Sequence, residues 1–317
     1  MTRLIQWPEP VVYSPDLNGR QPAGITEHSA NRVPLVTTRR CSRLASAITS
    51  ASDSVTLEVR DAAGAPVRRY SSKSDSTAKK WASAPPSDPV LATTAGLNRI
   101  VWDLRHATLP GVPGLHMEAN YRGHKATPGS YRFTLTMGSK TATTEGAILA
   151  NPLVATDAAS YVEYDAFMSA MEREFRLMHE TVNQLNPMQV RLTAVLAELP
   201  AGDAYAAIRR DGEALLAKLK TWDEEMVQRR TKVYDDVENF PQKFTAHYIF
   251  LLNQMESERP QVNQPAKDRR VELDKTWAAL KARADAMVNE DIPALDRKLS
   301  EAGIGAVGKT LKPRVVQ

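Results

Sequence analysis

Four side chains that can bind a metal ion lie within 19 positions of one another, in a stretch rich in proline and glycine: His106, His116, Glu118 and His124. Imidazole and carboxylate ligands suit zinc or copper, and an irregular loop could bring them together. However, their spacings of 10, 2 and 6 residues match no established metal motif. The sequence therefore favours solvated loop side chains, with a metal site as the alternative, and we expect no cofactor.

The remaining polar residues give little sign of catalysis. Asp103 could act as an acid, but its place on the polar face of a predicted strand favours a surface contact. The chain has no Gly-rich phosphate loop, no Gly-x-Ser-x-Gly and no nucleophile beside a base. A run of charged residues on a predicted helix falls mostly off its apolar seam and indicates a solvated face: Glu172, Arg173, Glu174, His179 and Glu180. We therefore expect no catalytic residues and no enzymatic activity.

Composition narrows the class of protein. The 317 residues carry 41 basic and 37 acidic side chains without a basic block, so we expect no nucleic-acid partner. Cys41 is the only cysteine, which excludes an internal disulfide and a cysteine-based metal site. The apolar runs are far shorter than the roughly 18 residues of a membrane span, and the first 16 residues lack the apolar core of a signal peptide. We expect a soluble chain with no visible export signal.

The histidine-containing loop is flanked by two predicted strands. Residues 96–104 place Ile100, Trp102 and Leu104 on one face, and residues 130–137 alternate in the same way from Tyr131 to Met137. Upstream, residues 55–60 alternate, 61–64 form a turn, and a return strand carries Val67 and Tyr70. A last strand covers 140–149. These strands predict a small antiparallel β-sandwich of immunoglobulin-like or fibronectin III type over residues 54–152.

After Thr156 the hydrophobic period changes to that of helices. Asp157 is a suitable N-cap, and Asn186-Pro187 is expected to interrupt or re-cap the first helix. Its seam follows a 3-4 spacing: Tyr161, Tyr164, Met168, Met171, Phe175, Met178, Val182 and Leu185.

Four more helices are expected: one starting at Asp203, one at Asn239-Phe240-Pro241, one preceded by Pro265, and one starting at Asp291-Ile292-Pro293 with a stop at Gly303. Their stripes are Ile208, Leu215, Leu219, Trp222, Met226 and Val233; Phe244, Tyr248, Leu251 and Met255; Leu273, Trp277, Leu280, Ala284 and Met287; and Ile292, Leu295 and Leu299. Unequal helices joined by short connections predict an antiparallel α-helical bundle over residues 157–303. The fold class is therefore α+β, a sandwich followed by a bundle.

The two ends of the chain show no such pattern. Residues 1–53 are rich in proline and arginine and lack a hydrophobic period. This composition predicts a poorly ordered leader, or a segment translated from a shifted reading frame or a misplaced start codon. Residues 304–317 are expected to form a C-terminal tail.

Several segments together resemble a known family: VTLEVRDAAGAPVRRYSS (55–72), GLNRIVWDLRH (96–106), TPGSYRFTLTMGSK (127–140), NFP (239–241) and DIPALDRKLSEAGI (291–304). They are similar to the C-terminal region of bacterial BNR-repeat, sortilin-like β-propeller proteins, often labelled glycosyl hydrolases. The resemblance covers roughly residues 54–307, and the β portion also resembles the Ig-like domain of flagellar hook-capping proteins.

The resemblance implies propeller blades upstream that hold any sugar or peptide site. We therefore expect a truncated or split relative that keeps the accessory tail, without residues onto which the hydrolase label could be transferred. It also implies a periplasmic or extracellular setting.

Two hypotheses of function follow. The first is a non-catalytic module that packs against a propeller or another protein, or self-associates. The second is a glycosyl hydrolase-related or carbohydrate- or metal-binding protein that uses the loop 105–128.

Overall fold

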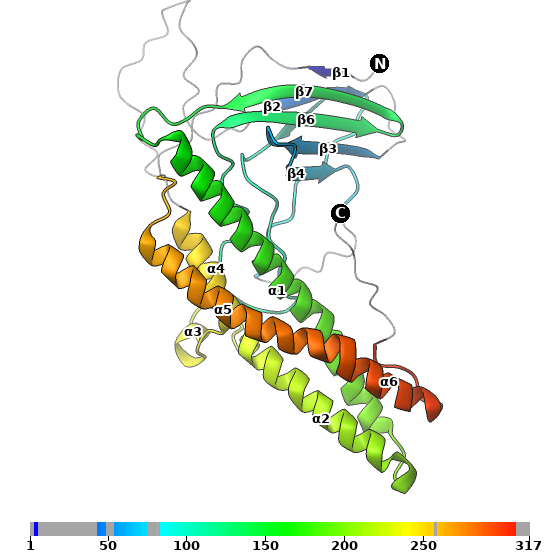
Figure 1. Ribbon diagram of the computed structural model, residues 1–317. Helices are drawn as coiled ribbons and strands as arrows, with labels where there is room; N and C mark the ends of the chain where they lie inside the picture. The colour runs from blue at the N-terminus through cyan, green and yellow to red at the C-terminus, as the bar shows by residue number, and fades with distance from the viewer. Residues whose placement is uncertain are drawn as a thin grey trace, which may run out of the picture.

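The computed structural model describes residues 54–308 apart from 75–80, 82, 257 and 258, together with two strands nearer the N-terminus. The fold is α+β, as the sequence predicts. Figure 1 shows the strands gathered at one end, with the helices extending away from them. The strands are β1 (Arg3–Ile5), β2 (Arg43–Ile48), β3 (Val55–Arg60), β4 (Pro66–Ser71), β5 (Gly96–Val101), β6 (Gly129–Met137) and β7 (Lys140–Ile148).

The strands form two antiparallel sheets. Four strands pair in the order β4-β3-β6-β7, and the other three in the order β1-β2-β5. The predicted hairpin around residues 61–64 is confirmed, because β3 and β4 pair with Leu57 opposite Tyr70. The second hairpin pairs Met137 with Lys140, and Gly138 supplies the positive φ of 56° that the two-residue turn requires. The first of these two turns was therefore predicted from the sequence.

The apolar face of the strand region surrounds Trp102, which is fully buried just after the end of β5. The rings of Tyr131 and Phe133 meet the indole edge-on, with centroids 5.4 and 5.8 Å away. The indole Nε1 donates to the carbonyl of Arg105 at 2.9 Å. The predicted alternation along β3 and β6 is confirmed, since every second side chain is buried. Trp102 thus joins the strand core to the segment that follows it.

The predicted leader is only partly described. Residues 3–5 and 43–48 form β1 and β2, which pair with each other, and β2 also pairs with β5. This corrects the expectation of a leader without structure at those two places, because the edge of β5 is open to β2 and the far edge of β2 is open to β1. The rest of 1–53, and residues 309–317 of the predicted tail, lie outside the described residues.

The helices lie side by side below the strands (Figure 1). α1 is the longest, and its N-cap Asp157 accepts a hydrogen bond from the Ser160 amide at 2.6 Å, as predicted. The helices are α1 (Ala158–Glu198), α2 (Asp203–Met226), α3 (Asp236–Asn239), α4 (Phe244–Met255), α5 (Gln264–Ala286), the π-helical turn η1 (Met287–Asp291) and α6 (Ile292–Glu301).

The expected break at Asn186-Pro187 is wrong, because α1 continues through Pro187. A proline inside a helix costs about 3 kcal/mol. The apolar seam continues beyond it with Met188, Leu192 and Leu196, all buried. Burial of these three side chains on one face outweighs the lost hydrogen bond.

Two other helix boundaries differ from the prediction. α4 begins at Phe244, not at residues 239–241, because Phe240 before the proline is extended. Val233 lies outside α2 and is exposed, since Arg229 folds back to pair with Asp223 at 2.5 Å and ends that helix.

The last predicted helix is not separate. α5 runs through the π-helical turn η1 directly into α6, and Asp291 makes no side-chain cap. Pro293 lacks the amide that a regular turn would need. The wider turn before it absorbs that defect, which explains why the sequence signal of a new helix start is misleading here.

The helices share one hydrophobic core that also takes in residues from the segment between β5 and β6. Most of the predicted stripes are buried, although Leu251 is only half-buried while Ile249 and Leu252 take its place. The members from the connecting segment are Leu109, Val112, Leu115, Met117 and Tyr121. The division at 54–152 and 157–303 stays a prediction, but these five side chains pack with the helices.

Candidate functional site

The segment Arg105–Pro128, called the strap below, folds back on itself. Its two ends pair as a short antiparallel ladder: the His106 amide donates to the His124 carbonyl at 2.9 Å, and the Leu109 amide to the Tyr121 carbonyl at 2.7 Å. His106 and His124 are therefore directly opposite each other, with side chains on the same face. Their rings stack with centroids 3.9 Å apart and planes inclined by 17°.

Gly123 allows the two arms of the strap to approach. A Cβ atom at this position would lie 2.5 Å from the carbonyl carbon and oxygen of His106, which are backbone atoms that cannot turn aside. The glycine is therefore required by the close contact of the arms that stacks the two histidines.

We expect Gly123→Ala to lower the free energy of unfolding by about 1–3 kcal/mol, the usual range for an overpacked site. Gly305→Ala is the control, because a Cβ there meets nothing within 4 Å. Urea unfolding followed by circular dichroism measures both. Equal stability of the two variants would contradict the close approach at Gly123.

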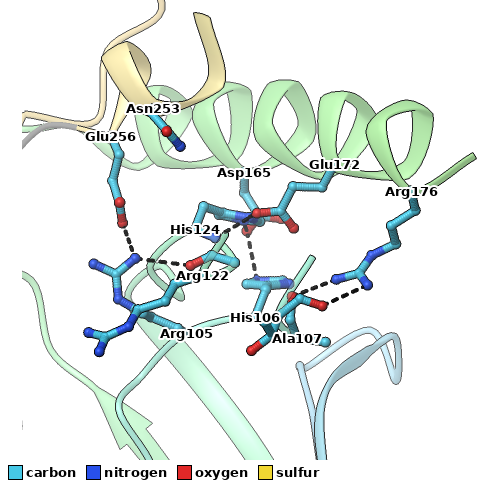
Figure 2. Close-up of polar contacts among 12 residues, drawn as sticks. Arg105, His106, Ala107, Arg122, His124, Asp165, Glu172, Arg176, Asn253 and Glu256 are labelled. Atoms are coloured by element: carbon cyan, nitrogen blue, oxygen red, sulfur yellow. Dashed lines mark hydrogen bonds and ion pairs between the residues drawn. The ribbon is translucent and has the colours of Figure 1, made fainter. Parts of the chain in front are cut away.

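Helix α1 supplies two carboxylates to this histidine pair (Figure 2). His124 is fully buried between them: its Nε2 lies 3.2 Å from Asp165 Oδ1, and its Nδ1 lies 3.0 Å from Glu172 Oε1. The contact at Nδ1 is ionic, since its angle does not fit a hydrogen bond. The His124 backbone amide does donate to Glu172 Oε1, at 2.6 Å. His106 Nε2 lies 3.7 Å from the same Asp165 oxygen.

The electrostatics of the cluster follow from this geometry. Burial acts to lower the pKa of His124, but the contacts with Asp165 and Glu172 outweigh it and raise the pKa to about 9. Burial and the neighbouring His124 lower the pKa of His106 to about 4. Burial opposes the ionisation of both carboxyls, yet His124 holds their pKa values below the usual range. The cluster is thus a buried imidazolium shared by two carboxylates beside a neutral imidazole.

Further along α1, a polar stripe binds the backbone of the strap. Arg176 donates to the carbonyls of Ala107 and Thr108, the latter at 2.9 Å (Figure 2). His179 Nδ1 donates to Pro110 O at 2.8 Å, and Asn183 Nδ2 to Gly111 O at 3.0 Å. With Asp165 and Glu172, these side chains recur every three to seven positions on one face of the helix. The strap therefore follows α1 for about five turns.

The returning arm of the strap is held by α4. Asn120 and Asn253 exchange two hydrogen bonds of 2.9 Å, one from each partner. Arg105 pairs with Glu256 just beyond the end of α4 and donates to the Gly123 carbonyl at 3.0 Å (Figure 2). Both arms are thus attached to helices.

Of the four residues singled out in the sequence, the structure brings two together. His106 and His124 stack, whereas His116 binds Ser83 through Nδ1 and Glu118 is exposed. Asp165, the residue that completes the cluster, comes from a distant helix and was missed.

The expected solvated face on α1 is partly wrong. Arg173 and Glu180 are exposed, but Glu172 and His179 are buried and Glu174 accepts from Trp277 Nε1 at 2.9 Å. The reason is that the strap covers Glu172 and His179, whereas α5 covers Glu174 through Trp277. The heptad spacing of residues 165, 172 and 179 was the available signal.

We expect the free energy of unfolding to depend on pH through His179. Burial lowers its pKa to about 4, so between pH 6.5 and 4 the unfolded chain binds a proton that the folded chain does not. The contribution of His179 to the free energy of unfolding is therefore complete above pH 6.5. It decreases as the pH falls, by about 3 kcal/mol at pH 4.

His179→Asn, which keeps a donor for Pro110, is expected to reduce the slope of unfolding free energy against pH by one proton in this window. His247→Asn is the control, since His247 is exposed on α4. Denaturant unfolding at half-unit pH steps measures the slopes. An unchanged slope in His179→Asn would contradict the assignment.

The comparisons with known proteins add no relative. No protein-family model matches the chain, and neither the curated proteins nor the solved structures contain a significant match. Among the described residues, no helix has both the length and the apolar character to cross a membrane.

Proposed function

We propose that the chain is a non-catalytic accessory module, related to the C-terminal region of BNR-repeat, sortilin-like propeller proteins. In this proposal an Ig-like sandwich and an antiparallel helical bundle form a support that packs against a propeller and mediates protein contacts.

The proposal rests on the contacts that the strap makes with the helices of the same chain. A long loop rich in histidine is where a substrate-binding function would be sought. Its carbonyls bind Arg176, His179 and Asn183, and its apolar side chains enter the helical core. These groups hold two parts of one chain together, so they are not free to recognise a ligand.

The junction between β7 and α1 gives a partner an apolar surface to cover. Leu149, Leu153 and Val162 are close in sequence there and exposed, Leu153 by 84%. Large exposed apolar side chains near one another favour a protein contact.

The test is binding to a purified BNR-repeat propeller, followed by size-exclusion chromatography and calorimetry. We expect a complex that Leu153→Glu weakens at least tenfold. Val271→Glu is the matched control, since Val271 is also exposed, on α5. Sedimentation of the chain alone tests whether two copies of the chain associate with each other instead.

The rival hypothesis is a glycosyl hydrolase-related or carbohydrate-binding protein. A panel of oligosaccharides and chromogenic glycosides tests it, with His116→Ala and His124→Ala as variants. Turnover or binding that these variants abolish, with no propeller complex and no self-association, would overturn the accessory role.

A further inference from the structure

Among the described residues, His106, His124 and Asp165 form a group whose ligand atoms all lie within 4.8 Å of one another. We propose that these three residues bind a divalent transition-metal ion, for which Zn²⁺ is the best match, at the joint between the strap and α1. This goes beyond the accessory role and does not depend on it.

The distances fit one ion. Donor atoms about 2.1 Å from a common zinc ion lie about 3.4 Å apart in tetrahedral geometry. The two histidine Nε2 atoms lie 3.2 and 3.7 Å from Asp165 Oδ1. All three ligand atoms lie within 4.8 Å of one another, so a change in the orientation of the two rings would bring them to one ion.

The ligands are held in place by their surroundings. The ladder fixes His106 opposite His124, and Arg68, itself 5% exposed, donates to the His106 carbonyl. Glu172 lies against Nδ1 of His124, the ring nitrogen that faces away from Asp165. A carboxylate beside the second nitrogen of a ligating histidine is a common support for a metal site. Binding of the ion would release the proton from Nε2 of His124.

The site is open on one side. The side chains of His124 and Glu172 are 0% and 6% exposed, whereas that of Asp165 is 36% exposed. An ion could therefore enter beside Asp165 and keep a water molecule in its fourth position. Two imidazoles and one carboxylate suit zinc or cobalt better than calcium or magnesium, which prefer oxygen ligands.

The experiment uses the full chain, without a tag, after treatment with a chelator. Zn²⁺ binding is measured by calorimetry, and Co²⁺ binding by its visible absorption. We expect one equivalent to bind with a dissociation constant of micromolar or below. Asp165→Asn should weaken binding on the order of 100-fold, and Glu172→Gln about 10–100-fold.

Asp103→Asn is the matched control, because Asp103 is an exposed aspartate outside the cluster, and it should bind like the unaltered chain. Circular dichroism checks folding, and His106→Ala replaces Asp165→Asn if that variant does not fold. Failure of the unaltered chain to bind one equivalent at millimolar Zn²⁺ would overturn the proposal. Equal affinity in the ligand variants would also overturn it, because the ion would then be bound elsewhere.

Discussion

Glu172→Leu is expected to lower the free energy of unfolding by about 3–5 kcal/mol, the cost of removing one partner from a buried ion pair. The carboxylate is 6% exposed. It forms an ion pair with the His124 ring and accepts a hydrogen bond from the His124 backbone amide. Without it, a buried donor and a buried charge at the strap lose their partner. Leucine keeps the volume, so the loss measures the polar contacts.

Glu180→Leu is the control for Glu172, because it lies on the exposed side of the same helix. We expect a change within about 0.5 kcal/mol for this variant. Chemical unfolding at pH 7 measures both. A loss below 1 kcal/mol for Glu172→Leu would mean that the strap is not fixed by this contact.

Trp102→Ala is expected to cost about 3–5 kcal/mol, as for other large aromatic side chains in a core. The indole is fully buried against Tyr131 and Phe133 and donates to the Arg105 carbonyl, the first residue of the strap. Its removal leaves a cavity and an unsatisfied carbonyl at the same time.

Trp102→Phe separates these two effects, because phenylalanine fills most of the cavity but cannot donate to Arg105. We expect it to recover more than half of the lost stability, and thermal unfolding of the two variants measures the recovery. If Trp102→Ala unfolds at the temperature of the unaltered chain, Trp102 is not the centre of the strand core.

The strands and helices were predictable where a single hydrophobic period decides them. β3 and β6 alternate cleanly, and α1 carries a seam from Tyr164 to Leu185, so local pattern and burial agree. Pro187 and Pro293 were misread because tertiary packing and a π-helical turn overrode the local preference of proline.

The candidate site was only half predictable. His106 and His124 were singled out by residue type, but their spacing of 18 residues gave no motif. Asp165 lies 41 residues beyond His124, on a helix whose polar residues resembled a solvent-facing side. Only the path of the strap along α1, which depends on contacts distant in sequence, shows that this side is covered.

Residues 105–128 form a fixed part of the core and not a mobile binding loop. Hydrogen–deuterium exchange of the native protein tests it most directly. We expect the amides of His106, Leu109 and Ala126, which donate to backbone carbonyls, and the amide of His124, which donates to the Glu172 carboxylate, to exchange as slowly as those in the middle of α1. Exchange of these four amides at the rate of an unstructured peptide would contradict it.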